Sequence, residues 1–205
     1  MLTKHEIMST SKPNIMSTKY NIAVAILAGG KSKRMGTDKA DLVRKDKETF
    51  LEHICKEMSH FTKKYLSLNA EQKYSIEGYE NIVDKYDGIG PVGAIAGVLE
   101  KAKADGMDAV LFVACDMPFY SYAHAMKTVD IYSGEDVVLP VVENRAEPLA
   151  AIYSVNILET VYENIRCNEY KLTDVIKKMH YREYVPDDYE AYSNINTKME
   201  FDNLK

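Results

Sequence analysis

The sequence lacks long apolar runs, an excess of basic residues and a dense set of cysteines, and each absence excludes a class of protein. No apolar stretch approaches the roughly 20 residues that a membrane-spanning helix needs, and residues 1–20 contain no apolar core of a signal peptide. With 26 Lys and Arg against 31 Asp and Glu, the net charge of −5 provides no basic footprint for nucleic acid or anionic lipid. Cys55, Cys115 and Cys167 cannot all pair and do not stand at metal-ligand spacing, so we expect reduced thiols and a cytoplasmic protein.

The composition is that of one globular domain preceded by a loose leader. The 205 residues are 46% hydrophobic and 28% charged, which suffices for a full core without disulfides or metals. Residues 1–20 are polar and contain Ile-Met-Ser-Thr twice, at 7–10 and 15–18, so we expect a flexible leader there. No Pro-, Gly- or Ser-rich linker interrupts the rest, and we expect a single domain over 21–205.

Short apolar runs alternate with helical patterns from residue 22 onward. Residues 22–27 are continuously apolar, as in a strand buried on both faces, and Thr49-Phe-Leu-Glu52 is typical of a capping box that opens a helix. The expected strands cover 22–27, 65–68, 81–83, 109–114, 137–142, 149–153 and 181–185. The expected helices begin at 49 and then cover 92–103, 122–131, 155–165, 173–179 and a last segment from 197. This alternation predicts an α/β fold, with a mostly parallel sheet and helices on both faces.

Ligands of such sheets bind at the carboxyl ends of the strands, and the first of these loops is rich in glycine and cations. It reads Leu27-Ala-Gly-Gly-Lys-Ser-Lys-Arg-Met-Gly-Thr-Asp-Lys39. The glycines let N–H groups approach an anion closely, and four cations lie within nine residues, at Lys31, Lys33, Arg34 and Lys39. This pattern is typical of a triphosphate-binding loop, although a solvated basic loop around a tight turn has the same composition. It is not a Walker A loop, because Ala25 stands where the first glycine is required.

A second candidate is Asp116, which follows the most apolar strand in Val113-Ala-Cys-Asp-Met-Pro118. A carboxylate at the end of a central strand can hold Mg²⁺, which prefers a few carboxylates together with substrate phosphates. The same residue type also serves as a turn or N-cap residue. Asp116 alone therefore leaves both interpretations open.

Two other patterns are weaker evidence for a functional site. Gly88-Ile-Gly-Pro-Val-Gly93 formally matches the dinucleotide fingerprint, but polar residues 84–87 separate it from the preceding strand, which disfavours a dinucleotide site. His53 and His60 lie seven residues apart near a predicted helix, with no third ligand candidate nearby. We interpret them as surface or amphipathic histidines.

Together these segments resemble a known family. Leu27–Ala40 is similar to the signature of the molybdenum cofactor guanylyltransferases, the MobA-like nucleotidyltransferases. The other segments that agree with the family in order and spacing are Leu68–Ala70, Asp84 with the loop Gly88–Gly97, Cys115–Pro118 and Asn194–Thr197; Glu147–Leu149 resembles the substrate-side loop. The resemblance covers essentially all of residues 23–204. It implies a single Rossmann-like nucleotidyltransferase domain.

The resemblance also implies a reaction and its partners. The terminal phosphate of molybdopterin would attack the α-phosphorus of GTP, so that pyrophosphate leaves and molybdopterin guanine dinucleotide forms. GTP and molybdopterin are the implied substrates, Mg²⁺ is the implied cofactor, and transient contact with other proteins of molybdenum cofactor biosynthesis is implied as well. No nucleic acid or membrane partner is expected.

The implied site residues transfer by motif. Those that match GTP-binding positions are Leu27, Ala28, Gly29, Gly30, Lys39, Asn69, Asp84 and Asp116, and Asp116 also matches the metal-binding position. Arg34, Lys39 and Asp116 are the expected catalytic residues: the backbone amides of 28–30, Arg34 and Lys39 would face the triphosphate, because phosphoryl-type transfer depends on positioning and charge stabilisation. Asn196 is either a second contact to the metal or pterin phosphate, or a capping residue before Thr197.

Three alternatives remain open at this stage. The first is a related transferase that uses CTP, since the glycine–lysine signature contacts phosphates and not the base. The second is a nucleotidyltransferase that acts on a sugar phosphate or an alditol phosphate. The third is a non-catalytic nucleotide-binding module, which the presence of both Lys39 and Asp116 disfavours.

Overall fold

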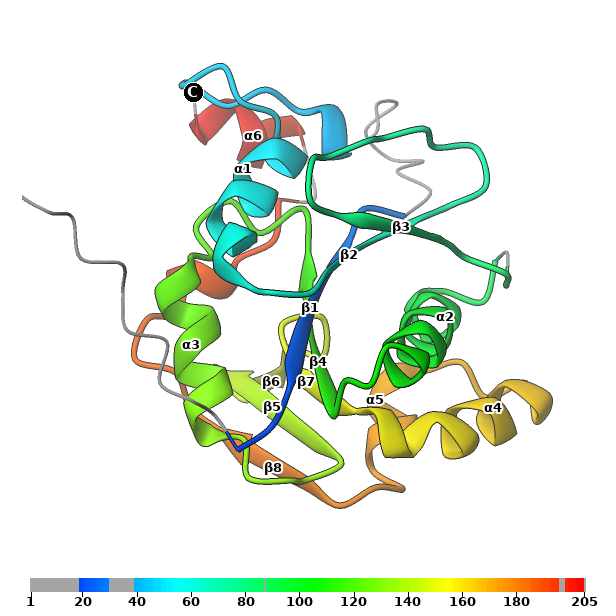
Figure 1. The fold of residues 1–205 in the computed structure, drawn as a ribbon. Coiled ribbons are helices and arrows are strands. Elements are labelled where there is room, and N and C mark those ends of the chain that lie inside the picture. Colours follow the sequence, from blue (N-terminus) through cyan, green and yellow to red (C-terminus); the bar gives the residue numbers. More distant parts are fainter. Residues whose placement is uncertain (1–18, 30–38, 87, 196–197, 205) are drawn as a thin grey trace, which may run out of the picture.

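The structure is a computed structural model that describes residues 19–29, 39–86, 88–195 and 198–204 (Figure 1). Its eight strands form one sheet in the order β3-β2-β1-β4-β7-β5-β6, with β8 paired to β5. The strands are β1 (Ile22–Leu27), β2 (Lys64–Leu68), β3 (Glu80–Val83), β4 (Ala109–Ala114), β5 (Val137–Val142), β6 (Arg145–Ala146), β7 (Ile152–Ser154) and β8 (Tyr181–Tyr184). The strand pairs β3–β2, β2–β1, β1–β4 and β5–β8 are parallel. Strand β7 is antiparallel to both of its neighbours, β4 and β5, and β6 is antiparallel to β5. The predicted mostly parallel sheet is confirmed.

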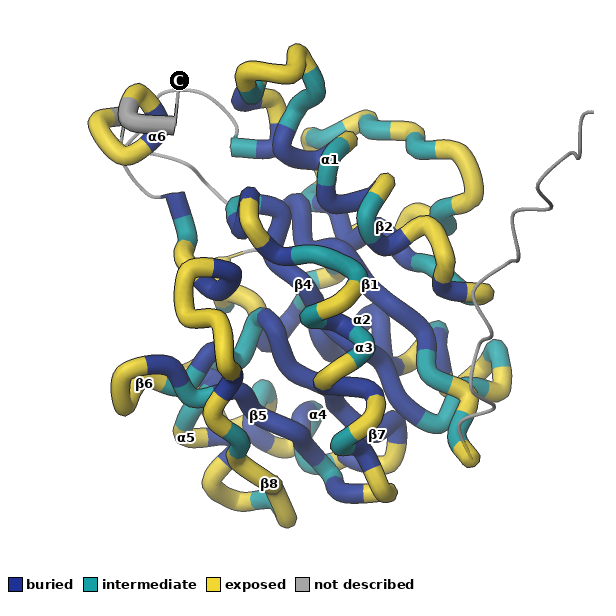
Figure 2. Tube along the Cα trace, turned by 90° about the vertical axis from the view of Figure 1, so that its left-hand side faces the viewer, coloured by how far each residue is buried: buried dark blue, intermediate teal, exposed yellow. Residues whose placement is uncertain are grey.

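Helices cover both faces of this sheet, as the alternation predicts. The helices are α1 (Phe50–Glu57), α2 (Pro91–Ala104), α3 (Tyr122–Ile131), α4 (Leu158–Arg166), α5 (Leu172–Ile176) and α6 (Lys198–Leu204). Figure 1 shows α1 and α3 on one side of the sheet and α2, α4 and α5 on the other. Within β1, Val24 and Ile26 pack into the core below α1 and α3, whereas Ala23 and Ala25 pack into the core below α2. The strand is apolar throughout because both of its faces are buried (Figure 2).

The capping box at the start of α1 is present. The Thr49 hydroxyl accepts a hydrogen bond from the Glu52 amide at 3.1 Å, and the Thr49 amide donates to the Glu52 carboxylate at 2.8 Å. These bonds satisfy two amides that the first helical turn leaves without partners. The hydrogen bonds from the Thr49 amide and hydroxyl to the Glu52 carboxylate lower the pKa of Glu52. The helix ends at Glu57, and a 3₁₀ turn over Met58–His60 continues the apolar face.

The strand expected over 149–153 is wrong in its first half, because β7 begins only at Ile152. Pro148 lacks an amide donor, and the Ala150 amide donates to the Glu147 carbonyl at 3.1 Å, which closes a turn instead. The short strand β6 was not expected. It forms because Glu143 and Asn144 both adopt positive φ (48° and 64°), which is the geometry of a tight two-residue hairpin turn.

Tyr20 packs on the domain just before β1. Its hydroxyl donates to the Ser133 carbonyl at 2.6 Å, and its ring meets Tyr132 edge-on at 5.0 Å. Gly134 has φ +111°, and a Cβ there would lie 2.7 Å from the Tyr20 hydroxyl oxygen, so glycine at this position leaves room for the Tyr20 side chain.

We therefore expect deletion of residues 1–19 to leave the melting temperature within a few degrees, because that deletion keeps the Tyr20 contact. Tyr20→Ala, in contrast, should lower the free energy of unfolding by about 2 kcal/mol, since a half-buried aromatic ring and its hydrogen bond are lost. Urea denaturation of the two variants measures the difference. A deletion that costs as much as Tyr20→Ala would contradict the expectation.

Candidate active site

The carboxyl ends of four parallel strands meet at one edge of the sheet. Leu27 of β1 stands in register with Ser67 of β2 and with Ala114 of β4. Hydrogen bonds continue this alignment past the strand ends: the Asp84 amide donates to the Leu68 carbonyl at 2.8 Å, and the Cys115 amide donates to the Leu27 carbonyl at 3.2 Å. The fold thereby gathers the loops that carry Gly29, Asn69, Asp84 and Asp116 at this carboxyl edge.

Lys39 and Asp116 form the central polar contact of the edge. The Lys39 ammonium donates to the Asp116 carboxylate at 2.7 Å, across 77 residues of sequence. The two side chains are only 20% and 16% exposed, so water screens this pair less than it screens a surface ion pair. Lys39 opens a 3₁₀ turn (Lys39–Asp41), and the Asp116 carbonyl accepts a hydrogen bond from the Ile195 amide at 3.0 Å. The structure therefore brings two of the three expected catalytic residues into direct contact.

The loops after β1 and β2 are joined by Gln72, a residue that the sequence analysis missed. Its side-chain amide donates to the Ala28 carbonyl at 2.9 Å and its side-chain oxygen accepts from the Asn69 amide at 3.0 Å. The Asn69 side-chain oxygen in turn accepts from the Gln72 amide at 3.1 Å. A Cβ at Gly29 would lie 3.3 Å from the Asn69 amide nitrogen, so glycine permits this close approach. An Asn followed three residues later by Gln is the only local signal for it.

The amides of Ala28 and Gly29 are already engaged at the sheet edge. Both donate to the carbonyl of Ser67, at 3.0 and 3.2 Å. The expectation that these two amides face a triphosphate does not fit this geometry. We therefore expect phosphate contacts of the first loop from residues after Gly29. Lys39 is described among these, whereas Gly30, Lys31, Lys33 and Arg34 lie outside the described residues, as does Asn196.

Asp84 supports the turn that leads into α2. Its carboxylate accepts a hydrogen bond from the Tyr86 amide at 2.8 Å. A Cβ at Gly93 would lie 3.1 Å from that carboxylate oxygen and 2.8 Å from the Tyr86 Cβ, which explains glycine in the first turn of the helix. The glycine-rich segment is therefore a turn packed against Asp84, in line with the sequence argument against a dinucleotide fingerprint.

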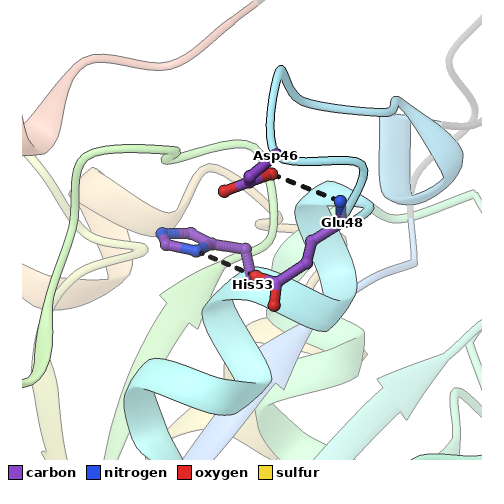
Figure 3. Close-up of side chains that lie close together, drawn as sticks. All are labelled: Asp46, Glu48 and His53. Carbon is purple, nitrogen blue, oxygen red and sulfur yellow. Dashed lines mark hydrogen bonds and ion pairs between the residues drawn. The ribbon is translucent and has the colours of Figure 1, made fainter.

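One group in the described part of the chain has the composition of a metal site: Asp46, Glu48 and His53, which offer ligand atoms within 4.8 Å of one another (Figure 3). His53 was expected to have no third ligand candidate nearby, and the hairpin before α1 supplies two. Cations already engage both carboxylates, since Lys56 lies 2.5 Å from Glu48 and Arg44 lies 3.4 Å from Asp46. Burial, with a smaller contribution from Arg44, lowers the pKa of His53. We interpret the group as an ion-pair network of the hairpin.

Two further features flank the edge. Glu147 is buried; burial raises its pKa, while the Arg145 guanidinium at 2.8 Å acts in the opposite direction. A cavity of about 510 Å³ lies between the segment that follows Lys39 and helix α6, and its lining residues are Asp41, Leu42, Val43, Arg44, Lys45 and Phe201.

No helix among the described residues is long and apolar enough to cross a membrane.

The fold and this edge define a class of protein: an α/β domain of the nucleotidyltransferase type, in which loops at the carboxyl ends of parallel strands form the site. The chain belongs to the family of MobA-like NTP transferase domains, whose family model matches residues 24–183. The family resemblance inferred from the sequence is confirmed, and the chain is a nucleotidyltransferase.

Relatives and solved structures agree with this assignment. A protein of Clostridium perfringens named "Probable molybdenum cofactor guanylyltransferase" is 28% identical over 196 residues, which cover 89% of this chain and 95% of that protein. Molybdopterin-guanine dinucleotide biosynthesis protein A from Archaeoglobus fulgidus has a TM-score of 0.73 at 22% identity, over 89% of this chain and 96% of the other. The 2-C-methyl-D-erythritol 4-phosphate cytidylyltransferase of Thermus thermophilus has a TM-score of 0.68 at 13% identity, over 88% and 95%. The two structures show the shared fold.

Proposed function

We propose that this protein transfers GMP from GTP to the terminal phosphate of molybdopterin and so forms molybdopterin guanine dinucleotide. A phosphate oxygen of molybdopterin forms a bond to the α-phosphorus of GTP, the bond from the α-phosphorus to the α,β-bridging oxygen breaks, and pyrophosphate leaves. The observation that carries the proposal is the Lys39–Asp116 pair at the carboxyl edge of a MobA-like domain. The guanylyltransferase name of the Clostridium relative supports the choice of GTP and molybdopterin.

Lys39 supplies the positive charge in this proposal. Phosphoryl-type transfer needs little covalent chemistry from the protein, so positioned charge is the main contribution that side chains can make. The Lys39 ammonium now contacts a carboxylate oxygen at 2.7 Å, and a phosphate oxygen is an equivalent acceptor. Negative charge grows on the leaving pyrophosphate, and a lysine on those oxygens stabilises the transition state more than the bound nucleotide.

Asp116 fits the requirements of a Mg²⁺ ligand. Its carboxylate stands directly after the central strand β4, is partly accessible at 16%, and lies at the edge where the nucleotide phosphates would bind. Mg²⁺ in nucleotide sites takes one or two carboxylates together with phosphate oxygens, so one protein carboxylate suffices. A bound Mg²⁺ would supply positive charge where negative charge develops at the α-phosphate. Asp116 would hold the ion, and Lys39 would exchange its carboxylate partner for phosphate.

Two alternatives use the same edge. A cytidylyltransferase shares the fold at a TM-score of 0.68, and Lys39 and Asp116 suit phosphates and a metal ion and not a base, so CTP is the competing nucleotide. A sugar phosphate or an alditol phosphate is the competing acceptor. A binding-only module is disfavoured, because simple binding does not require both the lysine and the carboxylate.

A thermal-shift panel with the four NTPs tests the nucleotide. With Mg²⁺ at equal nucleotide concentrations, GTP is expected to raise the melting temperature more than CTP, because the nucleotide with the lower Kd stabilises the folded protein more. A ligand at about 100 times its Kd contributes about 2.7 kcal/mol. Chelation of Mg²⁺ with EDTA serves as the control and should reduce the GTP effect. Stabilisation by CTP with no response to GTP would replace the proposal with the cytidylyltransferase alternative.

A further inference from the structure

A hairpin over residues 42–49 connects the turn of Lys39 to helix α1. It closes through the Val43–Thr49 bridge and through a hydrogen bond from the Arg44 amide to the Glu48 carbonyl at 2.9 Å. The Lys47 amide donates to the Arg44 carbonyl at 3.1 Å and closes the turn, and Lys47 itself adopts φ +72°. The hairpin begins next to the turn of Lys39, because the Leu42 amide donates to the Lys39 carbonyl at 3.2 Å.

The Arg44 side chain fastens this hairpin to the turn that follows Asp116. Its Nη1 donates to the carbonyl oxygen of Pro118 at 2.7 Å, across 74 residues of sequence. Its Nε lies 3.4 Å from the Asp46 carboxylate, which also accepts a hydrogen bond from the Glu48 amide at 3.2 Å. The Arg44 side chain is only 26% exposed, and Pro118 is buried, so this contact is sheltered from water.

We propose that Arg44 is a positioning residue for the Lys39–Asp116 pair. The lysine belongs to the chain segment just before the hairpin and the aspartate precedes Pro118 by two residues, so the Arg44–Pro118 bond holds together the two segments that carry them. A guanidinium suits this task because its donors have a fixed planar geometry, with one directed to the carbonyl and another to Asp46. The ion-pair network around Asp46 acquires a role here, since it orients the arginine.

The catalytic consequence rests on the proposed function, whereas the positioning itself does not. A misplaced charge costs rate steeply in transfer reactions, and a shift of about 1 Å can reduce turnover by roughly a factor of 100. Lys39 does not have to change its chemistry for this loss to occur. It only has to lie in the wrong place when the nucleotide binds.

The first test measures the Lys39–Asp116 contact without any turnover. Pulses of acetic anhydride acetylate lysines, and mass spectrometry gives the rate at Lys39 relative to the exposed Lys177, which is 69% accessible. An ammonium held against a carboxylate reacts slowly, so Asp116→Asn defines the rate of a Lys39 that lacks the Asp116 carboxylate. Arg44→Met should raise the Lys39 rate toward that value, and Arg44→Lys should give an intermediate rate.

Arg182→Met is the matched control. Arg182 also donates to a backbone carbonyl far away in sequence, that of Ile131 at 3.2 Å, but it belongs to β8 and not to the site. This variant should leave the Lys39 rate at the wild-type value even if stability falls. A wild-type Lys39 rate in folded Arg44→Met would overturn the inference, with folding checked by circular dichroism. If Arg44→Met does not fold, the same result in Arg44→Lys would overturn it.

The second test measures transfer and separates the two proposals. Arg44→Met should lower kcat roughly tenfold or more and leave the KM for GTP within about twofold, with partial rescue in Arg44→Lys. If the wild type transfers nothing while Lys39 becomes reactive in Arg44→Met, the proposed function fails and the positioning stands. If the wild type transfers GMP and Arg44→Met does so at the full rate, the positioning role fails alone.

Discussion

Lys39→Ala is expected to lower the rate of GMP transfer by roughly two to three powers of ten, as the loss of a single charge-stabilising group does in other enzymes. GTP binding should weaken far less, because the lysine acts most strongly on charge that develops only as pyrophosphate leaves. Single-turnover kinetics and a GTP titration measure the two quantities separately. Equal losses in binding and in rate would contradict this division of effects.

Stability has to be measured alongside, since the Lys39–Asp116 pair is mostly buried. Removing the ammonium leaves the Asp116 carboxylate without this partner, at a cost of about 1–3 kcal/mol, and the variant should still fold. Lys63→Ala is the matched control. Lys63 lies 2.6 Å from Asp105 and is 30% exposed, but it precedes β2 and so lies at the opposite end of the sheet. It should lose stability without losing turnover.

Asp116→Asn is expected to abolish both transfer and the Mg²⁺-dependent increase in GTP affinity. The amide keeps the shape of the side chain but lacks the charge that attracts a divalent ion, whereas Lys39 can still reach phosphate. Calorimetric titrations of GTP at a series of Mg²⁺ concentrations measure how far GTP affinity depends on Mg²⁺.

The control for these titrations is Glu159→Gln, which removes an exposed carboxylate of α4 that is paired with Arg166. Because this pair belongs neither to the site nor to the hairpin network, the variant should keep the full Mg²⁺ dependence. If Asp116→Asn retains normal Mg²⁺-dependent transfer, the metal binds elsewhere and the motif at Cys115–Pro118 does not mark its site.

Patterns local in sequence predicted the architecture well. The continuous apolar run of β1 indicated a strand buried on both faces, and the cores above and below Val24 and Ala25 confirm it. The Thr49–Glu52 box gave the start of α1 correctly because both of its hydrogen bonds span only three residues. The end of α1 was less clear, since the apolar spacing continues through a 3₁₀ turn.

Contacts between distant segments could not be predicted. The motif named Lys39 and Asp116 separately, but their contact depends on how β4 and the segment before α1 meet across 77 residues. Gln72 and Arg44 were missed for the same reason, because each acts on a backbone carbonyl more than 40 residues away. The sharp turn at Glu143 was missed because positive φ at a glutamate has no strong sequence signal.

The most direct test of the proposed function is product formation by the purified protein. It should be incubated with molybdopterin, Mg²⁺ and each of the four NTPs in turn, and the pterin dinucleotide and the pyrophosphate should be quantified by mass spectrometry and by a coupled assay. The proposed function predicts a guanine dinucleotide and pyrophosphate in equal amounts with GTP, and neither product from Lys39→Ala on the same timescale. A cytosine dinucleotide formed from CTP, or no dinucleotide from any NTP with folded wild-type protein, would contradict it.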